Sequence, residues 1–293
     1  MLRQDMEVAL PVEGARARYG SVRDQGFAVS VLWSAGIASD WGILSRLTSY
    51  IARQRRPQLS VVLRGRGYVA TDGVVTSLGV GDVVVLDQSR QDHEGYAGSP
   101  CEVLVFEWEP DIGLGPAHVG PPFIGRLGPR DLARLQALTS RFSEETALAW
   151  MLELVELLRV LGLGAEALPR APAIVTPRVA QLYRALGELR GQLDRHPSLP
   201  ELGEAVGLSE RQARRDLDEL ESQFSMPIDG FRDALSDMRM SHAQQLLSIE
   251  SLSLARVAQL SGFRSAIALS HAFTARSGQT PGEIRTLLRH RWR

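Results

Sequence analysis

The chain has 293 residues, 44% of them hydrophobic and 23% charged, and its formal net charge is −1. All 33 basic residues are arginines, which excludes Schiff-base aldolases, pyridoxal-phosphate enzymes and P-loop NTPases with the usual lysine. The single cysteine, Cys101, excludes an intramolecular disulfide and a Cys₄ metal site. The length predicts two or three domains. With no signal-like start and no run of about 18 apolar residues, we expect a cytoplasmic protein without a membrane partner.

The first predicted domain, residues 1–127, contains short valine-rich runs that are typical of β-strands. They lie at 27–33, 59–63, 68–71, 74–77, 83–86 and 102–108. Asp72-Gly73 separates two of these runs and predicts a hairpin with a type I′ turn, because Asp-Gly tolerates the positive φ that this turn needs. Strands at roughly 8–12-residue spacing indicate a sandwich or a barrel.

Prolines and glycines then mark a surface loop at 110–129, which is followed by two expected helices at 130–141 and 143–161. The second helix repeats apolar residues at helical spacing and ends at Gly162 and Gly164. This helical segment, 128–163, can pack on the β domain or against a second copy of the chain. Residues 164–177 carry three prolines and are interpreted as a linker.

The last predicted domain, residues 178–293, is helical throughout and contains two helix-turn-helix units. Ser198, Ser209 and Thr280 each begin a capping-box pattern, and Ser265 is a further N-cap without the reciprocal partner. One unit spans 200–221 and the other 254–275. Their turn glycines, Gly207 and Gly262, are 55 residues apart, so one supersecondary unit is duplicated.

The second helix of each unit is expected to enter the major groove of DNA. Its outward residues are Arg211, Arg214 and Arg215 in the first unit, and Ala266, Ile267, Ser270 and His271 in the second. Arginine can bond guanine or phosphate, methyl groups suit thymine, and serine or histidine can bond a base or a phosphate.

Regional charge supports DNA binding for the second unit more than for the first. Residues 251–293 hold seven arginines and one acid, a net +6, whereas residues 177–250 hold nine arginines and thirteen acids, a net −4. Asp216, Asp218, Glu219 and Glu221 would repel phosphate if they faced it. The alternative therefore stays open that the chain is an effector-binding or protein-interaction module whose helical domain binds DNA weakly or not at all.

Residues 199–285 resemble the DNA-binding domain of the AraC/XylS family of bacterial transcription regulators. The resemblance rests on Arg239–Leu247, which is similar to the family's linker helix, and on Val257-Ala258, Gly262-Phe263, Phe273, Gly278, Thr280-Pro281 and Arg285. It implies that a long helix joins two units that contact successive major grooves of double-stranded promoter DNA, with RNA polymerase as a further partner of an activator. Ala213, Leu269 and Ile284 depart from the family pattern, and 217–239 is longer than its spacing.

The β domain resembles the cupin-like sensor of such regulators through Gly79–Val84 followed by His93. This implies a small-molecule effector and a homodimer formed by the helical segment. A metal cupin needs about three histidines, but residues 1–117 contain only His93, so we expect a loop or rim residue there, no metal, no cofactor and no enzyme activity. Candidates for an effector pocket, equally explained as core or solvated side chains, are Trp33, Arg46, Tyr68, Phe106 and Trp108.

The predicted fold is thus an α+β multidomain protein. A cupin-like β-barrel or sandwich with a helical pair precedes an all-α domain of two helix-turn-helix units joined by a long helix.

Overall fold

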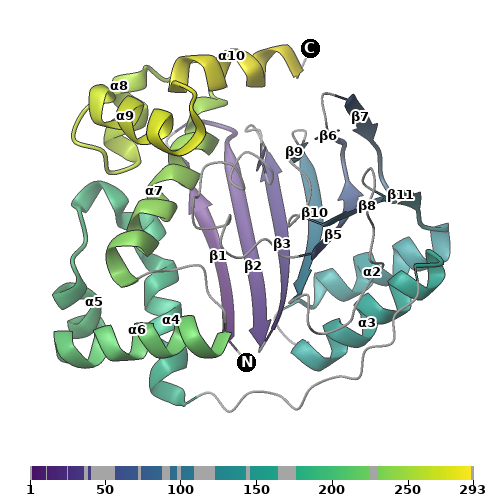
Figure 1. Cartoon of the computed structure of the whole chain (residues 1–293), viewed down its shortest axis with the longest axis horizontal. Coiled ribbons are helices and arrows are strands. Elements are labelled where there is room, and N and C mark those ends of the chain that lie inside the picture. Colours follow the sequence, from purple (N-terminus) through teal and green to yellow (C-terminus); the bar gives the residue numbers. More distant parts are fainter. Residues whose placement is uncertain are drawn as a thin grey trace.

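The computed structural model describes residues 2–10, 12–24, 26–35, 39–40, 57–71, 74–87, 93–97, 100–108, 123–142, 146–163, 176–224 and 230–291. Within these ranges an N-terminal antiparallel β domain precedes a C-terminal helical domain, as predicted (Figure 1). No helix in the described part is long and apolar enough to cross a membrane.

The strands are β1 (Leu2–Ala9), β2 (Arg16–Asp24), β3 (Phe27–Ala35), β4 (Ser39–Asp40), β5 (Pro57–Arg64), β6 (Gly67–Thr71), β7 (Val74–Leu78), β8 (Asp82–Asp87), β9 (His93–Ala97), β10 (Cys101–Trp108) and β11 (Phe123–Arg126). The helices are α2 (Pro129–Ser140), α3 (Ala147–Val160), α4 (Pro177–Glu188), the 3₁₀ helix η3 (Leu189–Arg195), α5 (Leu199–Ala205), α6 (Glu210–Phe224), α7 (Gly230–Leu247), α8 (Leu254–Leu260), α9 (Ala266–Ser277) and α10 (Pro281–Arg291).

Two antiparallel sheets form the N-terminal domain. The larger has the strand order β1-β2-β3-β10-β5-β8-β11 and the smaller the order β4-β9-β6-β7. β6 pairs with β7 with Thr71 opposite Val74, which confirms the predicted hairpin, although its two turn residues lie outside the described part. Five strands were not predicted: β1, β2, β4, β9 and β11. β11 corrects the expected loop at 110–129, and His93 begins β9 rather than lying in a loop.

One core lies between the large sheet and the helical pair. Because side chains alternate across a strand, every second residue of β5 points toward α2 and α3: Leu59, Val61 and Leu63 are fully buried there. Trp150 of α3 is fully buried against the sheet, with its ring centroid 6.1 Å from that of Phe106. The helical pair therefore packs on the β domain, the first of the two arrangements that the sequence left open.

A second core lies between the two sheets. It contains Val62, Val84 and Val103 of the large sheet together with Val69 and Leu78 of the small one. Cys101 is buried in the same core as a free thiol. The interior between the sheets is therefore mainly aliphatic.

The C-terminal helices form two cores, and the β1–β2 hairpin contributes to both. Leu2 of β1 is buried with helices α4, α5 and α6. Ala15, just before β2, and Ala17 are buried with helices α7, α8 and α9. Figure 1 shows the helical domain gathered along the β1 edge of the large sheet. The N-terminal domain is therefore packed against both halves of the helical domain.

Candidate DNA-binding surface

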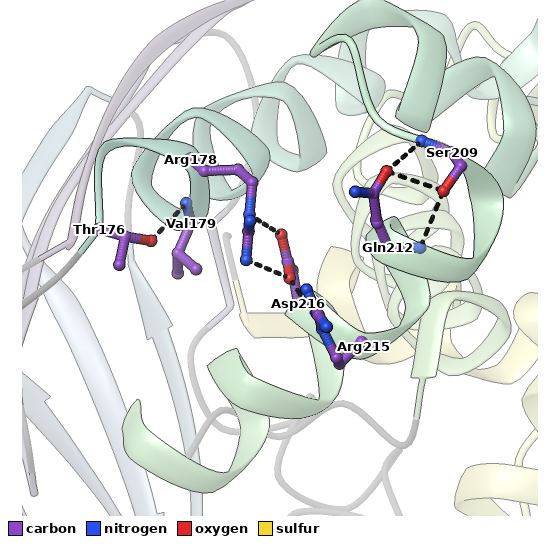
Figure 2. Close-up of polar contacts among 7 residues, drawn as sticks. All are labelled: Thr176, Arg178, Val179, Ser209, Gln212, Arg215 and Asp216. Carbon is purple, nitrogen blue, oxygen red and sulfur yellow. Dashed lines mark hydrogen bonds and ion pairs between the residues drawn. The ribbon is translucent and has the colours of Figure 1, made fainter.

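Helices α5 and α6 form the first helix-turn-helix unit, and α6 runs to Phe224, three residues past the predicted end. The Ser198 N–H donates to Glu201 Oε2 at 2.7 Å, and the Glu201 N–H donates to Ser198 Oγ at 3.4 Å. Hydrogen bonds from the Ser198 hydroxyl and, to a smaller extent, from the Ser198 backbone N–H lower the pKa of Glu201. Ser209 and Gln212 form the same reciprocal pair at the start of α6 (Figure 2). The predicted capping boxes therefore begin both helices.

The buried face of α6 follows helical spacing from Ala213 through Leu217 to Leu220, all at most 1% exposed. α5 approaches α6 closely at Gly203, where an added Cβ would lie 3.6 Å from the Ala213 Cβ and 2.7 Å from the Leu208 carbonyl oxygen. The small residue at 213 therefore suits this close crossing.

Asp216 lies on the buried face of α6 and cannot meet phosphate. It is fully buried, and both its oxygens accept bonds from Arg178 of α4: Nε donates at 2.6 Å and Nη2 at 3.0 Å (Figure 2). Its place is consistent with helical spacing, since it follows Ala213 by three residues and precedes Leu220 by four. Of the acids that would repel phosphate if they faced it, Asp216 is therefore turned inward, while Asp218 is exposed.

Arg211, Arg214 and Arg215 are all exposed on α6, as the helical pattern predicts. Arg214 donates to Glu210 Oε1 at 2.8 Å, and Arg215 Nε lies 3.8 Å from Asp216 Oδ1. Arg211 has no ion pair with any residue in the described part. This surface holds three guanidinium groups, two of them close to an acid of the same helix.

Helices α8 and α9 form the second unit. Ser253, which sequence reasoning did not mark, caps α8 by accepting from the Arg256 N–H, and Ser265 caps α9 by accepting from the Ala268 N–H, as predicted. The turn residue Gly262 has φ +77°, and an added Cβ would lie 2.3 Å from the Leu193 carbonyl oxygen. Glycine is therefore required here both for its conformation and for the close approach of η3.

The outward face of α9 is weakly polar. Ile267 is 69% exposed, which is the largest exposure among the large hydrophobic side chains of the described part. His271 is exposed, Ala266 and Ser270 are half-buried, and Leu269 and Phe273 are fully buried on the opposite face. All four predicted contact residues of this helix thus reach the surface.

Several arginines of the helical domain are used in internal bonds instead. Arg276 of α9 forms an ion pair with Asp237 of α7, and burial raises the pKa of Asp237 while Arg276 opposes that rise. Arg285 of α10 donates to the Leu247 carbonyl oxygen at 3.2 Å. In contrast, Arg264, in the turn before α9, is exposed, and sequence reasoning did not single it out.

The four predicted effector-pocket residues that the structure describes do not face the space between the sheets. Phe106 and Trp108 are buried in the core toward the helical pair, and Trp33 shares their side of the sheet by strand alternation. Tyr68 alternates with Val69 and so points away from the other sheet. Arg46 lies outside the described residues. A ligand between the sheets would therefore contact aliphatic side chains, not these aromatics.

In the described part, no group of three or more His, Cys, Asp or Glu residues could hold a metal ion.

A family model described as a helix-turn-helix domain matches residues 202–286, which span both units and the helix between them. Residues 202–286 form an AraC-type helix-turn-helix domain. This AraC-type domain covers the region where the sequence resembles that family, and both of its second helices carry the predicted contact residues at the surface.

Comparison with solved structures gives distant similarities. ToxT from Vibrio cholerae O395 has a TM-score of 0.38 and 12% identity, covering 94% of this chain and 99% of that one. The DNA-binding domain of AdpA, solved with a target DNA, has a TM-score of 0.33 and 25% identity over 38% of this chain and 95% of that one. The AraC-like transcriptional activator CuxR has a TM-score of 0.34 and 14% identity, with coverages of 72% and 78%. No curated protein matches the chain. The domain assignment rests on the family match.

Proposed function

We propose that the chain is a transcription regulator that binds double-stranded promoter DNA through its AraC-type domain and responds to a small molecule bound by its N-terminal domain. The observation that supports DNA binding most is the pair of exposed helix faces on α6 and α9. Arg211 and Arg215 suit phosphate or guanine, and Ile267 offers an exposed apolar side chain to a thymine methyl group. Arg264 and the positive C-terminal stretch would add contacts to phosphate.

Fluorescence anisotropy with a labelled duplex from the region upstream of its own gene, at rising salt, tests this proposal. We expect affinity to fall steeply with salt, because arginine–phosphate contacts release counterions. The variant Arg211→Ala/Arg215→Ala should weaken binding and lower the salt slope by about 1 for each phosphate contact that is lost. Arg159→Ala, which removes an exposed arginine of α3, is the matched control and should change neither. Absence of binding, or binding that salt does not affect, would refute the proposal.

A double variant on the outward face of α9 tests whether this helix recognises the DNA sequence. Ser270→Ala/His271→Ala should reduce affinity for the upstream duplex more than affinity for a scrambled duplex of equal length. A lost base contact typically costs about 1–3 kcal/mol, whereas a lost phosphate contact weakens binding to both duplexes equally.

A second candidate function is an effector-binding or protein-interaction module in which the helical domain has weak or no DNA binding. The acids on α6 favour it, because Glu210 holds Arg214 and Asp218 is exposed nearby. The burial of Asp216 weakens this alternative. If neither the α6 nor the α9 variants change DNA affinity, this second function is the better account.

The effector site that we propose lies between the two sheets. Its aliphatic lining includes Val62, Val84 and Val103, and the buried polar residues Ser34 and Ser60 lie on the same face of the large sheet. Apolar walls with a few polar groups are typical of small-molecule sites. A thermal-shift screen of small, mainly apolar molecules tests this site, because true ligands should lose their effect in the variant Val103→Trp, which fills the interior.

We also propose a homodimer formed through α3, with RNA polymerase as a further partner if the regulator is an activator. Leu152 lies four residues after Leu148 and eight residues before Val160 on α3, so the three lie toward one side of the helix, and all are exposed. Sedimentation velocity should show that Leu152→Glu shifts a dimer toward monomer. Val75→Glu is the matched control, since Val75 on β7 is 51% exposed, as is Leu152. Equal effects of the two variants would contradict the α3 interface.

A further inference from the structure

Strand β2 carries two neighbouring side chains that contact the helical domain. Tyr19 and Ser21 are two residues apart and therefore share one face of the sheet. The Ser21 hydroxyl lies 3.3 Å from the hydroxyl of Tyr183 on α4, and both residues are buried. The guanidinium carbon of Arg190 on η3 lies 5.1 Å from the centroid of the Tyr19 ring. The N-terminal domain thus contacts two consecutive elements of the helical domain, α4 and η3.

The contact at Ser21 leads through α4 to the second helix of the first unit. Arg178 lies on the same short helix as Tyr183 and holds the buried carboxylate of Asp216 with two hydrogen bonds (Figure 2). Two parallel bonds between a guanidinium and a carboxylate fix orientation as well as distance. The position of α6 is therefore tied to β2 through α4.

The contact at Tyr19 leads through η3 and α7 to the second helix of the second unit. η3 packs against α7 and approaches the turn before α9, where a Cβ added to Gly262 would lie 2.3 Å from the Leu193 carbonyl oxygen. Asp237 forms the ion pair with Arg276 of α9, and Arg276 also donates to Ser236 Oγ at 3.0 Å. The position of α9 is therefore tied to the same strand through a different set of residues.

Apolar packing follows the same division. The start of the β1–β2 hairpin inserts Leu2 into the core of the first unit, and its other end inserts Ala15 and Ala17 into the core of the second. A single hairpin therefore contacts both units, each through one polar and one apolar set of contacts.

We propose that the β1–β2 hairpin sets the spacing between α6 and α9, with Tyr183 and Arg190 as the positioning residues. The functional consequence of this inference rests on the proposed function. Two helices that enter successive major grooves must lie about one DNA turn apart, so their spacing matters for DNA binding. A molecule that binds the N-terminal domain would then change DNA affinity by favouring one spacing over another.

Pulsed electron paramagnetic resonance on the full chain without DNA measures this spacing directly. Cys101→Ala removes the only cysteine, and Asp218→Cys on α6 with Thr274→Cys on α9 places two exposed nitroxide labels. In this background we expect one narrow distance distribution. Tyr183→Phe/Arg190→Met removes the hydroxyl contact and the guanidinium while it keeps the apolar bulk, and it should broaden or shift the distribution.

A control variant separates positioning from general loss of stability. Arg134→Met removes the ion pair between Arg134 of α2 and Glu153 of α3, which lies within the N-terminal domain. It should leave the distribution unchanged even if it lowers the melting temperature as much. The single variant Tyr183→Phe, which removes one oxygen atom, serves if the double variant does not fold.

An unchanged distribution in the folded positioning variants would overturn the inference, as would equal broadening by Arg134→Met. Because the distances are measured without DNA, they decide the inference independently of the DNA-binding experiment. If the chain fails to bind DNA, the proposed function fails while the spacing result still stands.

Discussion

His242 on α7 should make the folded chain less stable as pH falls below 7. Neither of its ring nitrogens has a hydrogen-bond partner in the described part of the chain. Burial, with a smaller contribution from Arg190 and against the opposing effect of Asp194, lowers the pKa of His242 from 6.5 to about 4. The folded chain therefore holds this imidazole neutral where the unfolded chain has protonated it.

The sign and size follow from proton linkage. Between pH 6.5 and 4 the unfolded state binds more protons at this residue than the folded state, so the free energy of unfolding falls as pH is lowered. The loss is about 2 kcal/mol at pH 5 and approaches about 3 kcal/mol at pH 4, since one pKa unit corresponds to about 1.4 kcal/mol.

Urea unfolding of the native chain and of His242→Leu, from pH 8 to pH 4, measures this loss. Contributions from carboxylates are common to both proteins and cancel in the difference. The variant should gain about 2 kcal/mol relative to the native chain between pH 7.5 and pH 5. The difference should be flat from pH 7.5 to pH 8, which serves as an internal control. A difference that stays constant down to pH 4 would refute the argument that His242 is buried in its neutral form.

Two further changes test internal contacts of the helical domain by urea unfolding. Arg178→Ala should lower the free energy of unfolding by about 2 kcal/mol, because it leaves the buried Asp216 carboxylate without its two hydrogen bonds. Arg178→Met/Asp216→Leu should recover most of that loss, because no charge stays buried. Gly262→Ala should lower the free energy of unfolding by about 2 kcal/mol more than Gly207→Ala does. Both glycines have positive φ, but only at Gly262 would the new Cβ meet a carbonyl oxygen, that of Leu193. Equal costs for the two glycine variants would show that the close contact with η3 is unimportant.

Local signals predicted much of the fold. The capping patterns at Ser198, Ser209 and Thr280 depend on residues three positions apart, and each forms the expected pair. The Asp-Gly signal likewise predicts a pairing between adjacent strands. Such features follow from neighbouring residues, so the sequence alone contains them.

The sequence patterns do not predict β1 and β2, because some buried residues of this hairpin pack with the helical domain and not with the core of their own sheet. β1 is an edge strand rich in charged and polar residues, and its buried Leu2 packs with helices nearly two hundred residues later in the chain. The position of Asp216 on the buried face of α6 follows from helical spacing. Its bond to Arg178 joins residues 38 positions apart, and no local pattern predicts such a pair.

Ion pairs between distant residues also reduce the charge that each helix-turn-helix unit can offer to DNA. The count of +6 for 251–293 includes Arg276, and the count of −4 for 177–250 includes Asp237. These two residues neutralise each other inside the domain, so removing the pair changes the counts to +5 and −3. The asymmetry therefore survives, but the difference between the units is 8 charges rather than 10. Since a chain without lysine must also build its internal ion pairs from arginine, the arginine count of a region overestimates the cations that it offers to phosphate.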